Sequence, residues 1–178
     1  MNRKRHKKRT RIIASKAPVS DGNKKPLTLT ERMTADVRER AERFREWYES
    51  RFEEKLPYSM DSVRKLDFLL YRNRRGETLS EESVFLMQSF FSEILRRNLG
   101  GKYELDSKKK QVLVNFGGLK AWSDEKILRA IKNLERDGIP KNAYSLKTHG
   151  PLESYLFNIA RKVSAIRNRE NDENEQKQ

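Results

Sequence analysis

The chain has 178 residues, of which 37% are charged and 35% hydrophobic, and its net charge is +14 at pH 7. This composition predicts one domain with extensions. The absence of cysteine excludes disulfides, thiolate metal sites and cysteine nucleophiles. No apolar run approaches the ~20 residues that span a bilayer, and the basic N-terminus lacks the apolar segment of a secretory signal. We therefore expect a soluble, cytoplasmic protein with no membrane partner.

The positive charge is concentrated at the N-terminus. Residues 1–30 hold ten Lys and Arg against one acidic residue, a local charge of +9, whereas residues 31–178 hold 30 basic and 25 acidic residues. A block this dense in one charge is typical of an interaction tail. Residues 1–28 also lack hydrophobic periodicity, so we predict a disordered basic arm. It contacts phosphate in the functional interpretation and acts as a solubilising tail or localisation signal in the alternative. The candidate phosphate contacts are Arg3, Lys4, Arg5, Lys7, Lys8, Arg9 and Arg11.

A long amphipathic helix is predicted over residues 29–57. Thr28 and Glu31 have the spacing of a capping box, apolar residues then recur at steps of three and four, and Pro57 ends the pattern. The aromatic residues of this stripe are most simply core side chains. Exposed in part, they could instead grip a partner protein or stack on unpaired bases. The partner-binding candidates are Trp47, Tyr48 and Phe52.

A compact α+β domain is predicted over residues 58–167. Its first helix begins near Ser59 or Asp61 and ends in a second basic patch, which either clamps phosphate or compensates the helix dipole. This patch consists of Arg72, Arg74 and Arg75. We do not expect a helix-turn-helix, because the next helix offers phenylalanines and two first-turn glutamates where base contacts would be needed.

The third helix follows Ser80 and ends at Gly100, and a β-hairpin follows near 102–116. The hairpin tip holds Lys108, Lys109 and Lys110, which either reach toward a nucleic-acid backbone or keep the turn soluble. A fourth helix starts after Ser123, a fifth starts at Pro151, and residues 168–178 form a polar tail. The predicted fold class is thus α+β and mostly helical, with about five helices and one hairpin between the third and fourth.

No pattern of catalytic or cofactor-binding residues is present. The two histidines, His6 and His149, are far apart in the sequence, and no phosphate-binding glycine loop or serine nucleophile motif occurs. We therefore predict no metal, cofactor or catalytic residue, although scattered carboxylates of a metal-dependent nuclease would escape this reasoning.

These observations favour a non-enzymatic nucleic-acid-binding or ribonucleoprotein-associated protein. Its basic arm would contact phosphate and its folded domain would dock, with RNA favoured over DNA. The alternative is a protein–protein adaptor or inhibitor, of phage or mobile-element type, that grips its partner through the aromatic stripe of the first long helix.

Overall fold

The computed structural model describes residues 27–74, 79–141, 143 and 149–175. Within these ranges the chain forms five helices and one three-stranded antiparallel sheet, which lies between the third and fourth helices in sequence. This confirms the predicted α+β, mostly helical class. The predicted basic arm lies outside the described residues up to position 26.

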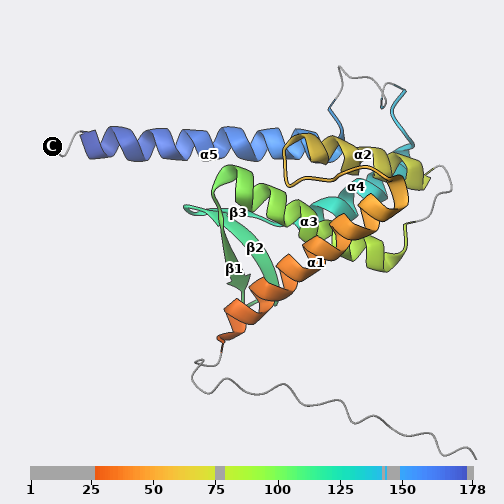
Figure 1. Cartoon of the computed structure of the whole chain (residues 1–178). Coiled ribbons are helices and arrows are strands. Elements are labelled where there is room, and N and C mark those ends of the chain that lie inside the picture. Colours follow the sequence, from red (N-terminus) through yellow and green to blue (C-terminus); the bar gives the residue numbers. More distant parts are fainter. Residues whose placement is uncertain (1–26, 75–78, 142, 144–148, 176–178) are drawn as a thin grey trace, which may run out of the picture.

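The helices pack around one central member (Figure 1). Helix α3 runs along α1 on one side and contacts α4, α2 and α5 on others. Thus α1 belongs to the same folded body as the later elements. The helices are α1 (Leu29–Phe52), α2 (Asp61–Arg74), α3 (Glu81–Leu99), α4 (Ser123–Asp137) and α5 (Pro151–Glu175).

Helix α3 forms the centre of the core because it is apolar on nearly every face. Met87, Phe90, Phe91, Ile94 and Leu95 are fully buried. Burying each such side chain stabilises the fold by about 1.5–3 kcal/mol. A helix with so broad an apolar arc needs neighbours on several sides, and α1, α2, α4 and α5 supply them.

Helix α1 begins as predicted but ends earlier than Pro57. The Thr28 backbone N–H donates to the Glu31 carboxylate at 2.7 Å and the Glu31 N–H donates to the Thr28 hydroxyl at 3.2 Å, which completes the capping box. At the other end Glu53 adopts a left-handed conformation, with φ of 52°. The chain then turns so that Leu56 becomes fully buried, with its N–H donated to the Glu49 carboxylate at 3.0 Å. Tertiary burial of Leu56, rather than Pro57, therefore sets this boundary.

The sheet has one strand more than the predicted hairpin. Strands β1 (Lys102–Asp106) and β2 (Gln111–Phe116) pair antiparallel, with Tyr103 opposite Val114. Strand β3 (Leu119–Ala121) then pairs with β2. The β2–β3 turn consists of Gly117 and Gly118, both at positive φ, where glycine carries no steric penalty. Three residues are too few to show an alternating pattern, so β3 gave no strand signal in the sequence.

Helix α5 is capped by a residue of α2. The carboxylate of Asp67, whose side chain is only 2% exposed, accepts the backbone N–H groups of Leu152 at 2.9 Å and Glu153 at 3.0 Å. Gly150 packs so closely here that a Cβ would lie 2.3 Å from the Asp67 carboxyl carbon. The first helical turn of α5 is thereby fixed to α2.

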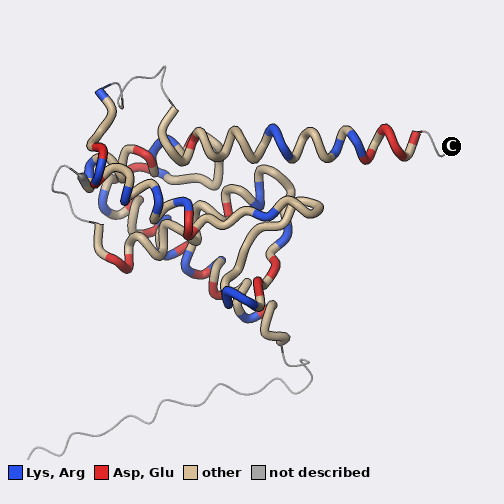
Figure 2. The backbone as a smooth tube through the Cα atoms, turned by 180° about the vertical axis from the view of Figure 1, so that it is seen from behind, with Lys and Arg blue, Asp and Glu red and all other residues tan. Residues whose placement is uncertain are grey.

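The C-terminal part of α5 projects beyond the folded body (Figure 1). The helix continues through the polar residues after Asn168 as far as Glu175, and these are exposed. Figure 2 shows basic residues along its middle and acidic ones toward its end. None of the five helices described here is long and apolar enough to cross a membrane.

Candidate nucleic-acid interface

Most of the predicted phosphate contacts lie at the chain's N-terminus. The seven arm cations between Arg3 and Arg11, and also Arg75, lie outside the described residues. Arg74 is the last residue of α2, and Arg72 lies in the last turn of the same helix. The three lysines Lys108, Lys109 and Lys110 form the β1–β2 turn.

Two predicted sites that are separate in the sequence meet in space. The guanidinium carbon of Arg72 lies 5.3 Å from the centre of the Phe52 ring, so the basic end of α2 touches the aromatic stripe of α1. Arg51 contributes a second guanidinium, 6.0 Å from Phe52 and 5.8 Å from the ring of Trp47. These distances are within the range of cation–π attraction.

The two arginines border a cavity of about 180 Å³ between α1, α2 and the start of α3. A more open hollow of about 480 Å³ adjoins it, since both are lined by Trp47, Ser80 and Ser83. We call this continuous depression the Trp47 groove. Its narrow part is defined by Trp47, Arg51, Phe52, Arg72, Ser80 and Ser83.

The three aromatic candidates differ in exposure. Tyr48 is 6% exposed, and its hydroxyl donates to Glu54 at 3.1 Å. Burial, with the nearby Glu54 carboxylate, raises the pKa of Tyr48 to about 12. Trp47 and Phe52 are half-buried, and their rings meet edge to face at 6.2 Å. Trp47 and Phe52 therefore present surface to the groove, whereas Tyr48 is part of the core.

The start of α3 forms one wall of the groove. Ser80 caps the helix by accepting the Ser83 N–H at 3.1 Å. Glu82, in the open hollow, pairs with Arg43 at 2.6 Å. Among the described residues that line the narrow part, the charged side chains are Arg51 and Arg72. The narrow part therefore favours an anion.

The three lysines of the β1–β2 turn differ in their contacts within the chain. The Asp106 carboxylate accepts the N–H groups of Lys108 at 3.0 Å and Lys109 at 3.2 Å, which closes the turn. The Lys109 ammonium pairs with Glu125 and lies 4.8 Å from the Trp122 ring. Lys108 and Lys110 are exposed. Lys109 therefore joins the β1–β2 turn to the start of α4, and its two neighbours remain the better candidates for a phosphate contact.

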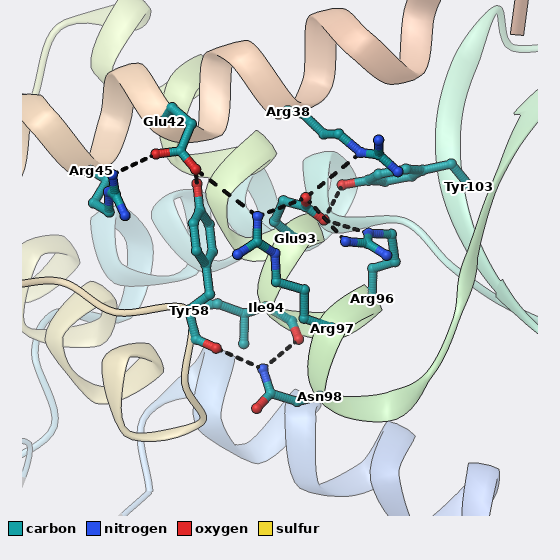
Figure 3. A network of polar contacts seen from close by, with 10 residues as sticks. All are labelled: Arg38, Glu42, Arg45, Tyr58, Glu93, Ile94, Arg96, Arg97, Asn98 and Tyr103. Carbon is teal, nitrogen blue, oxygen red and sulfur yellow. Dashed lines mark hydrogen bonds and ion pairs between the residues drawn. The ribbon is translucent and has the colours of Figure 1, made fainter. Parts of the chain in front are cut away.

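The buried carboxylate of Glu93 lies between α1, α3 and β1 and forms ion pairs with several arginines (Figure 3). Glu93 is fully buried and accepts hydrogen bonds from Arg96 at 2.5 Å, Arg97 at 3.4 Å and the Tyr103 hydroxyl at 3.2 Å. Arg38 lies at 3.9 Å. Burial by itself raises the pKa of Glu93, but the two neighbouring guanidinium groups and the Tyr103 hydroxyl outweigh it and hold that pKa below its usual value. Glu93 therefore stays ionised and is a structural anion rather than a proton donor.

The same network contains a second, more exposed carboxylate (Figure 3). Glu42 contacts Arg45 at 2.8 Å, accepts from the Tyr58 hydroxyl at 3.1 Å and lies 4.0 Å from Arg97. Four arginines thus surround two glutamates, so this network carries more positive than negative charge. Arg96 and Arg97 were not among the predicted site residues. Their spacing of three and four residues from Glu93 was a signal for part of the cluster, whereas Arg38 and Tyr103 come from other elements.

The described residues contain no group of three or more His, Cys, Asp or Glu side chains that could hold a metal ion. The acidic residues discussed above face arginine, lysine or backbone N–H groups. These sites attract anions, and they present aromatic side chains. Comparison of the chain with protein-family models, with curated proteins and with solved structures gives no match.

Proposed function

We propose that this protein binds nucleic acid without catalysing a reaction. The observation that carries the proposal is the uneven charge, because residues 1–30 hold +9 of the net +14. Seven cations between residues 3 and 11, with no acidic residue among them, match a phosphate backbone. In this proposal the basic arm contacts phosphate and the folded body docks beside it.

RNA, alone or within a ribonucleoprotein, is the favoured partner, and the cytoplasm the favoured location. Proteins recognise RNA mainly through its shape and through single-stranded loops whose bases stack on aromatic or guanidinium groups. The folded body supplies both group types at Trp47, Phe52, Arg51 and Arg72. A basic arm adds affinity along any neighbouring phosphate backbone.

The alternative is an adaptor that grips a protein through Trp47, Tyr48 and Phe52. It is supported by the half-buried rings of Trp47 and Phe52. It is weakened by Tyr48, which is only 6% exposed and hydrogen-bonded within the chain. The two arginines beside the rings favour an anionic ligand, so we place nucleic acid first.

A mobility-shift assay tests the proposal with the full chain. Single-stranded RNA, single-stranded DNA and duplex DNA of about 16 nucleotides are titrated with the wild type and with a variant in which the seven arm cations become glutamine. A control variant instead replaces the exposed cations Lys132, Arg136, Arg161, Lys162 and Arg169 of α4 and α5. We expect strong weakening in the arm variant and little change in the control. Equal binding by wild type and arm variant would overturn the role of the arm, and no binding to any nucleic acid would overturn the proposal.

A further inference from the structure

We propose that the Trp47 groove holds one unpaired nucleotide, with its base against the Trp47 ring and its phosphate on Arg51 and Arg72. This inference rests on the proposed nucleic-acid binding and adds a site that is selective for single strands. It requires an aromatic surface that is already fixed in place, two guanidinium groups that converge, and a cavity of suitable size. The described residues supply each of these.

The Trp47 ring is held in place by its neighbours. It packs at 5.4 Å against the fully buried Phe44 and meets Phe52 edge to face, at an interplanar angle of 85°. A ring fixed in this way loses little conformational entropy when a ligand binds. Stacking on an aromatic face accepts any base, because every base has a π face.

Arg51 and Arg72 approach the groove from two different helices. Both are exposed residues whose guanidinium groups lie over the Phe52 ring, at 6.0 and 5.3 Å. A guanidinium group can stack on an aromatic ring and also donate two parallel hydrogen bonds to a phosphate. The start of α3 lines the same cavity at Ser80 and Ser83. Ser80 already accepts the Ser83 N–H, and Glu81 and Glu82 occupy the first turn, so the attraction for an anion comes from the two arginines.

The size of the cavity selects the ligand. About 180 Å³ is below the ~300–1,000 Å³ of pockets that enclose drug-sized molecules, so the narrow part suits one phosphate group beside Arg51 and Arg72. The adjoining hollow of about 480 Å³, which Trp47 also lines, leaves room for the base. Its charged side chains are Arg43, Glu46 and Glu82, so it does not favour a second phosphate. A base that is paired and stacked within a duplex cannot reach the Trp47 ring, so the ligand class is single-stranded nucleic acid.

The distance along α1 from its start to the groove guides the choice of a short test strand. Leu29 and Trp47 lie on one helix, about 27 Å apart at ~1.5 Å per residue. A strand stacked as in a duplex spaces its phosphates by ~3.4 Å and needs about eight nucleotides to reach from the start of α1 to the groove, whereas an extended strand needs fewer. A tetranucleotide can therefore occupy the groove without bridging to the start of α1.

The chain contains two tryptophans, Trp47 and Trp122. Once Trp122 is replaced, the fluorescence of Trp47 alone provides the readout. In the full chain, Trp122→Phe leaves Trp47 as the reporter and removes a buried indole N–H that has no hydrogen-bond partner. Tetrauridylate and, separately, inorganic phosphate are titrated into this variant. We expect tetrauridylate to quench Trp47 emission and phosphate alone to quench it far less. Arg51→Gln and Arg72→Gln should each weaken tetrauridylate binding at least fivefold, whereas Arg169→Gln on the exposed end of α5 should not.

The outcomes separate this inference from the proposed function. An RNA of about 16 nucleotides that binds in an arm-dependent manner, while tetrauridylate leaves Trp47 emission unchanged, would overturn the groove site and leave the proposed function standing. Failure of both RNAs to bind would overturn both. Equal quenching by phosphate and by tetrauridylate would overturn the stacking role of Trp47. If a glutamine variant does not fold, Arg51→Lys and Arg72→Lys replace it, and a loss smaller than fivefold but measurable is expected, because lysine keeps the charge without the planar fork.

Discussion

The guanidinium group of Arg72 on α2 lies over the ring of Phe52 on α1, 5.3 Å from its centre. This contact joins a basic helix end to an aromatic stripe and, with Arg51 and Trp47, forms one wall of the Trp47 groove. It makes the groove a product of the tertiary fold. Phe52 and Arg72 thus also have a structural role, because their contact joins α1 to α2.

Mutation to alanine measures how much each aromatic residue contributes to the free energy of unfolding. Phe44 is fully buried, so Phe44→Ala should lower the free energy of unfolding by about 3–5 kcal/mol. Trp47 is half-buried, so Trp47→Ala should lower it by only about 1–3 kcal/mol, through the smaller apolar area lost. Urea unfolding followed by far-UV circular dichroism gives both values. Equal losses for the two variants would mean that Trp47 is a core residue and does not belong to an accessible groove.

The cap that Asp67 provides for α5 should be essential for docking that helix. Asp67→Ala leaves the buried N–H groups of Leu152 and Glu153 without acceptors, and we expect a loss of about 1–3 kcal/mol for each unsatisfied group. Gly150→Ala should also destabilise, since its Cβ would lie 2.3 Å from the Asp67 carboxyl carbon. Asp172→Ala, on the exposed end of α5, is the matched control and should change stability by less than about 0.5 kcal/mol. Wild-type stability in either test variant would show that α5 does not depend on this contact.

The same carboxyl group should make stability depend on pH. Burial raises the pKa of Asp67 to about 7, although the Leu152 and Glu153 N–H groups offset part of this effect. In the unfolded chain the group titrates near 3.9, as a free aspartate does. The folded state therefore binds the extra proton between about pH 4 and 7, so this group's contribution to stability falls as pH rises through that window. Asp67→Asn should remove this part of the pH dependence, as measured by urea unfolding at a series of pH values, and an unchanged profile would contradict the assignment.

Glu93 should affect the pH dependence of stability in the direction opposite to Asp67. Glu93→Ala leaves Arg38, Arg96 and Arg97 facing one another around a buried gap, and breaking a buried ion pair typically costs about 3–5 kcal/mol. Glu42→Ala, whose side chain is 41% exposed, is the matched control and should cost about 1 kcal/mol or less. Because the pKa of Glu93 is lowered, the stability it provides is present at neutral pH. That stability should be lost as pH falls below about 4, the usual range of a glutamate. The stability of wild type, Glu93→Ala and Glu42→Ala at pH 7 checks the predicted losses. The stability of wild type and Glu93→Gln at pH 7 and pH 3 checks the pH dependence.

The elements that the sequence predicted are those with local signals. The capping box at Thr28 and Glu31, Gly100 after α3 and Pro151 at the start of α5 all mark helix ends through groups within one turn. The end of α1 was misjudged because Leu56 leaves the helix to enter the core. Residues after Asn168 gave no helix signal because they carry no apolar stripe, although polar side chains can continue a helix that is already formed.

The site was less predictable than the fold. The sequence indicated the aromatic residues of α1 and the arginines of α2 as two separate candidates, because nothing local states that Phe52 and Arg72 meet. Nor could the apolar stripe distinguish buried Tyr48 from half-buried Trp47, since adjacent residues on a helix differ in direction by ~100° and both border the same face. The full Glu93 cluster was hidden because Arg38 and Tyr103 come from α1 and β1, far from Glu93 in sequence.

The salt dependence of RNA binding shows whether the basic arm contacts phosphate. Each phosphate that a cation neutralises on a single strand contributes about −0.7 to the slope of log Kobs against log salt concentration. Titration of the full chain with single-stranded RNA between about 50 and 200 mM salt should give a steep negative slope. Replacing the seven arm cations by glutamine should make that slope shallower by up to about 5. The same slope for both proteins, or binding that does not respond to salt, would show that the arm cations do not contact phosphate.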